Sequence, residues 1–265
     1  KKGLQKRRPF FLLIFALKVL QMINSVRNTV LSVLNKNNYG YISPSDFNLF
    51  AKQAQLDIFE DYFYQYNYQI NKENARQSGT GYADITKGYS EVIDSFSVTE
   101  YLSYITDNTF SVPTELTTGS DYYLINKVLF YNGTSLKEME QVSHSKITML
   151  LNSLYTAPSV TFPAFTIEDS TLTAYPDTIP ATATEKVKCQ YIRYPEDPKW
   201  TYLSLTGGEP AFDSTASDYQ DFELPLDNEP DLIMKILQYA GMSIREIAAV
   251  NFAQAAENKD DADQK

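Results

Sequence analysis

Apolar residues recur at helical spacing along the first part of the chain. Those between residues 22 and 36 predict a first helix: Ile23, Val26, Val30, Val33 and Leu34. A second helix is predicted over 44–68, because Ser43 can cap it and Pro44 suits its first position. Asp46 stands three residues after the cap, which comes close to a capping box.

The apolar side chains of this second helix fall on two nearly opposite faces. One face holds Phe47, Phe50, Ala51, Ala54, Ile58 and Tyr62, and the other holds Leu49, Leu56, Phe59 and Phe63. A surface helix usually has a single apolar face. The helix is therefore expected to be central in its own fold, or to keep one face for another chain. The candidate oligomer interface is Leu49, Leu56, Phe59, Phe63, Tyr64, Tyr66 and Tyr68.

The middle of the chain has the pattern of strands. Residues 71–88 are polar and interrupted by glycine, which predicts a loop or mobile arm. Residues 121–131 end at Asn132-Gly133, a tight-turn signal, and a helix is expected from Glu138 to Leu154. Short runs rich in Thr, Val, Ile and Tyr then predict strands: 160–169, 170–176, 186–194 and 199–205.

The C-terminal part returns to helical spacing. A helix is expected to open near Asp227 or Asn228 and to stop at Gly241, a suitable left-handed C-cap. Ser243 and Glu246 then form a capping box for a second helix, which is expected to run to about Glu257 before a polar tail.

These elements predict an α+β fold with N-terminal helices, a central antiparallel sheet or small sandwich with one helix, and a C-terminal helical pair. The expected parts, within one continuous structural unit, are 1–21 (outside the core), 22–100, 101–226 and 227–265. Residues 1–21 have a basic start and an apolar run from Phe10 to Leu17, but Lys18 interrupts the run and no cleavage site follows. We expect them to be upstream sequence; the alternative is an export signal or anchor.

Composition narrows the classes of function. The 265 residues carry a net charge of −10, which disfavours a nucleic-acid binder, because phosphate binding depends on Lys and Arg clusters. It would still suit a protein that lets DNA slide past without adhesion. The chain has 20 Tyr and 15 Phe, residues that suit interfaces as well as cores.

Candidate chemistry is sparse. The chain has one cysteine, Cys189, and one histidine, His144, which opens a predicted helix where a surface or capping role is expected. Nucleophile-elbow, dinucleotide-binding, P-loop and calcium-loop motifs are missing from the sequence. We therefore expect no catalytic residues, no bound metal and no cofactor.

Two segments carry a family resemblance: YGYISPSDFNLFAKQAQLDIFEDYF at 39–63, and the run from MLLNSLYTAPS at 149–159 to YIRYPEDPKW at 191–200. Together they resemble virion structural proteins of short-tailed phages, especially crAss-like and related phages of Bacteroidetes. The order of elements is similar over roughly residues 22–255. The resemblance implies a neck ring or head–tail connector component near the portal. Residues 1–21 depart from the pattern.

The function expected from the sequence is a virion connector or neck ring subunit that joins portal to tail and lets DNA pass. Its expected partners are copies of itself in a ring (a dodecamer, by the resemblance), the portal, and tail or other neck proteins. Assembly would take place in the host cytoplasm, without a membrane. The alternatives are a secreted or surface β-rich module that binds glycans, and a carboxylate-dependent hydrolase.

Overall fold

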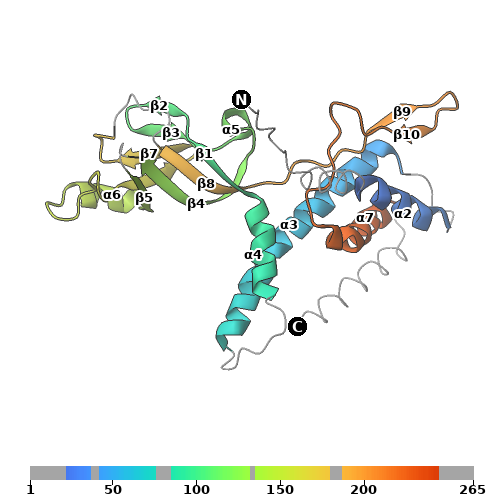
Figure 1. The fold of residues 1–265 in the computed structure, drawn as a ribbon, viewed down its shortest axis with the longest axis horizontal. Helices are drawn as coiled ribbons and strands as arrows, with labels where there is room; N and C mark the ends of the chain where they lie inside the picture. Colours follow the sequence, from blue (N-terminus) through green and yellow to red (C-terminus); the bar gives the residue numbers. More distant parts are fainter. Residues whose placement is uncertain (1–21, 37–41, 76–84, 132–134, 180–186, 245–265) are drawn as a thin grey trace, which may run out of the picture. The chain divides into compact units, whose positions relative to one another are not determined.

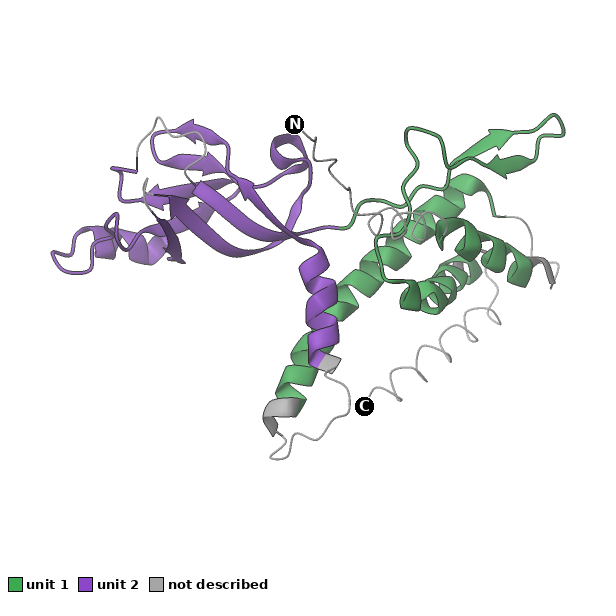
Figure 2. Cartoon of the chain, in the orientation of Figure 1, with its two compact units in different colours: residues 1–82, 195–265 green, residues 83–194 purple. Residues whose placement is uncertain are grey.

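The computed structural model describes residues 22–36, 42–75, 85–131, 135–179 and 187–244. The chain divides into two compact units: Lys1–Tyr82 with Pro195–Lys265, and Ala83–Tyr194 (Figure 2). The boundaries of these two units differ from the boundaries of the parts expected from the sequence. Helices and a large mixed sheet are both present, which confirms the α+β prediction.

The first unit is built on helices. Helix α2 spans Met22–Lys36, α3 spans Pro44–Ala75, and α7 spans Glu229–Ile244 after a 3₁₀ turn, η1, at Leu226–Asn228. Helix α7 packs against both α2 and α3. Each helix buries one apolar stripe, as helical periodicity requires. The buried residues along these stripes include Ile23, Val26, Val30, Leu34, Phe47, Ala51, Ala54, Ile58, Leu232, Ile236 and Ala240.

The segment 195–224 completes this unit and includes a small hairpin, β9 (Tyr202–Ser204) with β10 (Pro210–Phe212). Asp221 in this segment accepts hydrogen bonds from the backbone N–H groups of Met22 and Ile23, at 3.2 and 2.8 Å. It therefore caps α2 from a distant part of the sequence, where a negative side chain also suits the helix dipole.

The second unit begins with α4 (Ile85–Ser95) and continues into an eight-stranded sheet (Figure 1). The strand order is β1-β8-β4-β5-β6-β7-β3-β2. The bounds are β1 Ser97–Tyr101, β2 Tyr104–Thr106, β3 Thr109–Ser111, β4 Tyr122–Tyr131, β5 Leu136–Gln141, β6 Ala164–Glu168, β7 Thr171–Tyr175 and β8 Val187–Arg193. The short helix α5 (Glu115–Thr118) joins β3 to β4.

This sheet curls around one apolar core, to which most of its strands contribute. The core contains Phe110, Val128, Phe130, Met139, Phe165, Leu172, Cys189 and Tyr191. Helix α6 (His144–Leu151) lies over the other face and buries Ile147 beside Val142 and Ala164. Because α6 crosses over between β5 and β6, these two strands pair in parallel, whereas the other pairs in the sheet are antiparallel.

Several predicted elements match the structure. Helix 22–36 is confirmed, and Ser43 caps α3 by accepting a hydrogen bond from the Asp46 N–H at 3.1 Å. The four runs between 160 and 205 contain β6, β7, β8 and β9. Tyr122–Tyr131 form β4, which pairs antiparallel with β5, and the predicted turn at Asn132-Gly133 lies outside the described residues.

Other predictions are wrong. Helix α3 continues past Tyr68 to Ala75 and α4 starts at Ile85, so both ends of the expected 71–88 arm are helical, and 76–84 lie outside the described residues. The expected helix from Glu138 to Leu154 is split between β5 and the shorter α6, because Met139 enters the sheet core as a strand residue. Helix α7 passes through Gly241 to Ile244. Ser243, the expected cap of a second C-terminal helix, also lies within α7, so the predicted start of that helix is wrong. The rest of the expected second helix, from residue 245, and the segment 1–21 lie outside the described residues.

Candidate functional site

The predicted interface on α3 is only partly exposed. Leu49 is 64% exposed and Tyr64 is also open, whereas Phe59 is 1% exposed and belongs to the core. The remaining members are half-buried: Leu56, Phe63, Tyr66 and Tyr68. The assignment of Phe59 to a free surface is therefore wrong. The Phe59 ring makes an edge-to-face contact with that of Phe63, at 5.1 Å between ring centroids.

The reason is a polar stripe on α3 that the apolar pattern did not reveal. Asn48, Lys52 and Gln55 repeat at helical spacing, and Phe59 continues their line one turn further. Asn48 exchanges hydrogen bonds with the Trp200 backbone at 2.9 and 3.2 Å, and Lys52 pairs with Asp197 at 2.6 Å. Gln55 donates to the Glu196 carbonyl at 2.7 Å. This stripe holds the segment 195–224 within the first unit.

A different surface exposes apolar side chains densely, in the segment 149–162 of the second unit. Tyr155 is 93% exposed, Leu154 88%, Phe162 78% and Met149 74%. The end of α6 and the chain after it project from the sheet there (Figure 1). The sequence carries no charged residue from 147 to 167, in a chain that is 21% charged. We call residues 149–162 the apolar segment.

Local contacts give the apolar segment its form. The Asn152 side chain donates to the Thr148 carbonyl at 2.9 Å, and the Ser159 N–H donates to the Phe162 carbonyl at 3.1 Å. Ile147 anchors α6 on the sheet, while Met149 and Leu154 point away from that anchor into solvent. The segment is thus an ordered display of apolar groups, a kind of surface that monomers rarely keep.

Groups that could support catalysis are dispersed. The single histidine, His144, is exposed at the start of α6 and pairs with Glu168. Cys189 is buried in the sheet core, and burial raises the pKa of its thiol to about 12, so little reactive thiolate forms. Among the described residues, no group of three or more His, Cys, Asp and Glu side chains could hold a metal ion.

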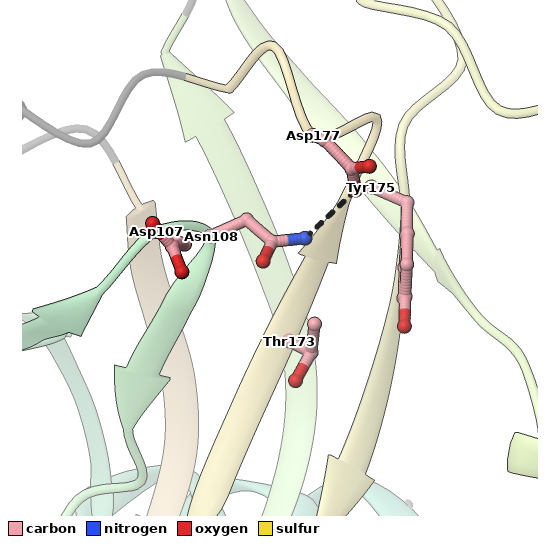
Figure 3. Close-up of a pocket in the computed structure, with 5 residues that line it drawn as sticks. All are labelled: Asp107, Asn108, Thr173, Tyr175 and Asp177. Atoms are coloured by element: carbon pink, nitrogen blue, oxygen red, sulfur yellow. Dashed lines mark hydrogen bonds between the residues drawn. The ribbon is translucent and has the colours of Figure 1, made fainter.

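One polar pocket lies elsewhere in the same unit (Figure 3). It has a volume of about 440 Å³ and is lined by Asp107, Asn108, Thr173, Tyr175 and Asp177. The first two residues form the turn between β2 and β3, and the others belong to β7 or follow it. Sequence reasoning did not find this pocket, because its two halves are more than 60 residues apart.

The sequence did hold a signal for the apolar segment, since its run without charge is long. The sequence prediction instead placed this region, up to Leu154, in a helix that begins at Glu138. No protein-family model and no curated protein sequence matches the chain. Within the described part of the chain, the search for a helix long and apolar enough to cross a membrane found none.

Proposed function

We propose that this chain is a non-enzymatic structural subunit of a phage virion, in the connector or neck ring that joins portal to tail. The observation that carries the proposal is the apolar segment. Its exposed side chains lie at the start of the run from 149 to 200, the second of the two segments that resemble short-tailed phage virion proteins.

Burial energetics favour a protein neighbour for this segment. A fully buried Leu, Met or Phe side chain contributes about 1.5–3 kcal/mol, before the cost of ordering both partners. Leu154, Tyr155 and Phe162 would supply a compact anchor of the kind found at interface centres. Because ring subunits meet through two different patches, such a segment would dock on a different surface of the next subunit.

The remaining features are compatible with a DNA passage. The net charge of −10 would repel phosphates and keep a channel free of adhesion. Leu49 and Tyr64 of α3 stay available as further contacts, in line with the expectation from the sequence. The dodecameric ring, the portal and tail partners, and assembly in the host cytoplasm belong to this proposal through the resemblance.

The first test is to look for the chain in purified phage particles by mass spectrometry, and for closed rings of the purified chain by native mass spectrometry and negative-stain microscopy. We expect the chain to be a stoichiometric virion component and the purified protein to form rings at micromolar concentration. A chain that stays monomeric and is missing from virions would overturn the proposal. Glycan binding by that monomer would then favour the surface-module alternative.

A further inference from the structure

The pocket at the β2–β3 turn lies on the face of the sheet opposite the main core. Thr173 and Tyr175 alternate along β7 with Leu172 and Ala174, which are buried in that core. The pocket volume of about 440 Å³ lies within the usual range of ligand sites, about 300–1,000 Å³. Three features of its lining indicate which kind of ligand fits.

The first feature is that the amide donors of Asn108 are already used. Its side-chain nitrogen donates to the Ala174 carbonyl at 2.6 Å and to Asp177 Oδ1 at 3.2 Å, the second bond being dashed in Figure 3. A carboxamide has two N–H donors, so none is left for a ligand. The opposite amide orientation would place Oδ1 against two oxygens. The side-chain oxygen of Asn108, an acceptor, is therefore the group that remains for a ligand.

The second feature is an excess of acceptors around the pocket. Asp107 and Asp177 contribute carboxylates, which only accept hydrogen bonds, and neither takes part in an ion pair with another described residue. Beside Thr173 in the sheet register stands Thr166, whose hydroxyl is buried and has no hydrogen-bond partner among the described residues. A ligand here must bring donors and would benefit from a positive charge.

The third feature is an aromatic wall. Tyr175 stands across the pocket from Asn108 and Thr173 in Figure 3. Its ring is half-buried, because it also packs against the small cluster of Val142, Ile147 and Ala164. An aromatic face held in place next to carboxylates attracts organic cations. A hard metal ion gains nothing from such a wall, since calcium prefers six to eight oxygen ligands.

We propose that this pocket binds a guanidinium or ammonium group carried on an aliphatic stem. The cation would donate hydrogen bonds to Asp107, Asp177 and the Asn108 oxygen, with its stem against Tyr175. A basic side chain of a partner protein and a free polyamine share this chemistry. A sugar fits less well, because its hydroxyl oxygens also need donors, and within the pocket lining these would come from the Thr173 and Tyr175 hydroxyls alone.

The test is isothermal titration calorimetry of the full-length chain, which detects ligand binding whether or not the protein assembles. The probes are N-acetyl-arginine amide, N-acetyl-lysine amide and spermidine. The neutral control is N-acetyl-citrulline amide, which has nearly the shape of the arginine probe without its charge. We expect saturable binding of at least one cationic probe, and none of citrulline. Saturation by the amino-acid amides but not by spermidine would indicate a side chain as the source, and the reverse a polyamine.

A pair of variants localises the binding. Asp107→Asn with Asp177→Asn should weaken binding roughly tenfold or more, the equivalent of about 1.4 kcal/mol. Asp107 has φ +47°, a conformation that Asn also tolerates, so the turn should survive. Asp169→Asn is the matched control, because Asp169 is also exposed with φ +50° but does not line the pocket. We expect that control to bind like the unmodified chain.

The proposal would be overturned by three results. The first is an absence of saturable binding with all three cationic probes. The second is equal binding by citrulline, or binding only of Ca²⁺ or a methyl glycoside in parallel titrations. The third is an unchanged affinity in the double variant whose spectrum shows a folded chain.

Discussion

Trp200 in the segment 195–224 and the side chains of the apolar segment 149–162 differ in burial. Both segments nevertheless overlap the regions that resemble phage virion proteins. In the first, Trp200 is buried and its ring stacks on Tyr202 and Phe212 at 5.7 and 5.8 Å. In the apolar segment, Leu154 and Tyr155 are among the most exposed apolar residues of the described chain. Trp200 has its partners within the chain, whereas Met149, Leu154, Tyr155 and Phe162 belong to neither apolar cluster described in the second unit.

This difference in burial indicates that apolar side chains have two different roles in the two segments. Around Trp200, contacts come from α2 and α3: the Arg27 guanidinium lies 3.8 Å from the ring centroid, and Asn24 accepts from the indole N–H at 3.1 Å. Folding of the first unit accounts for these residues. Folding of the second unit does not account for the apolar segment, since only Ile147 and half-buried Leu150 of α6 face its sheet. Such a surface is of the kind that monomers rarely keep, which is why we propose an external partner for it.

The largest effect is expected from removing the buried indole of Trp200. We expect Trp200→Ala to lower the free energy of unfolding by about 3–5 kcal/mol, because a large buried aromatic is lost and a cavity remains. Urea unfolding followed by far-UV circular dichroism would measure it. Leu203→Ala in the neighbouring exposed hairpin is the control, expected within about 0.5 kcal/mol of the unmodified chain. Equal stability of the two variants would contradict the description of Trp200 as an anchor.

Polar substitutions in the apolar segment test whether its exposed side chains serve assembly. Leu154→Ser with Tyr155→Ser should leave monomer stability within about 1 kcal/mol, since both side chains are exposed. The same variant should weaken self-assembly by about tenfold or more, because interface anchors are lost. Analytical ultracentrifugation over a concentration series would measure this. Leu116→Ser, in the same unit and 96% exposed, is the matched control that should assemble normally. Unfolding of the double variant would place these residues in the core.

A smaller effect concerns the Asp221 cap. Burial raises the pKa of the Asp221 carboxyl above its ordinary value of 3.8, against the opposing effect of the backbone N–H groups it accepts from. The unfolded chain therefore releases this proton first as pH rises. The contribution of Asp221 to stability should be greatest below pH 3.8 and should fall as pH rises toward the raised pKa of the folded state.

Urea unfolding of the unmodified chain and of Asp221→Asn, compared between pH 3 and pH 7, isolates this contribution. Hydrogen bonds lost in the variant give an offset that does not depend on pH, so the trend of the difference is the readout. We expect the unmodified chain to lose stability relative to the variant as pH rises. The opposite trend would mean that the α2 N-terminus and its hydrogen bonds outweigh desolvation of the carboxylate.

The elements that the sequence predicted well are those with strong local patterns. The apolar spacing of 22–36 and the capping residues Ser43 and Pro44 act within a few residues, so α2 and the start of α3 followed from them. Residues 136–154 were ambiguous, because their apolar positions fit a helix as well as a strand followed by a helix. Only the pairing of β5 with β4 settles that ambiguity in favour of a strand.

The sites depended on contacts between distant residues. The polar stripe of α3 contacts the segment 195–224, which comes more than 140 residues later in the chain. No local pattern therefore showed that Phe59, next to that stripe, is buried. The pocket joins a turn at Asp107 and Asn108 to the end of β7 through a strand pairing that no local pattern predicts. The apolar segment, in contrast, could have been predicted from its run without charge.

The most direct test of the central claim compares oxidation of Met149 and Tyr155 in the free chain and in purified virions by hydroxyl-radical footprinting and mass spectrometry. Both side chains are open in the structure, at 74% and 93% exposure, so the free chain should be modified readily at each. If the apolar segment is an assembly surface, modification of both should fall at least about fivefold in the particle, as expected for contacts at the dry centre of an interface. Equal modification of the free and assembled chains would contradict the account.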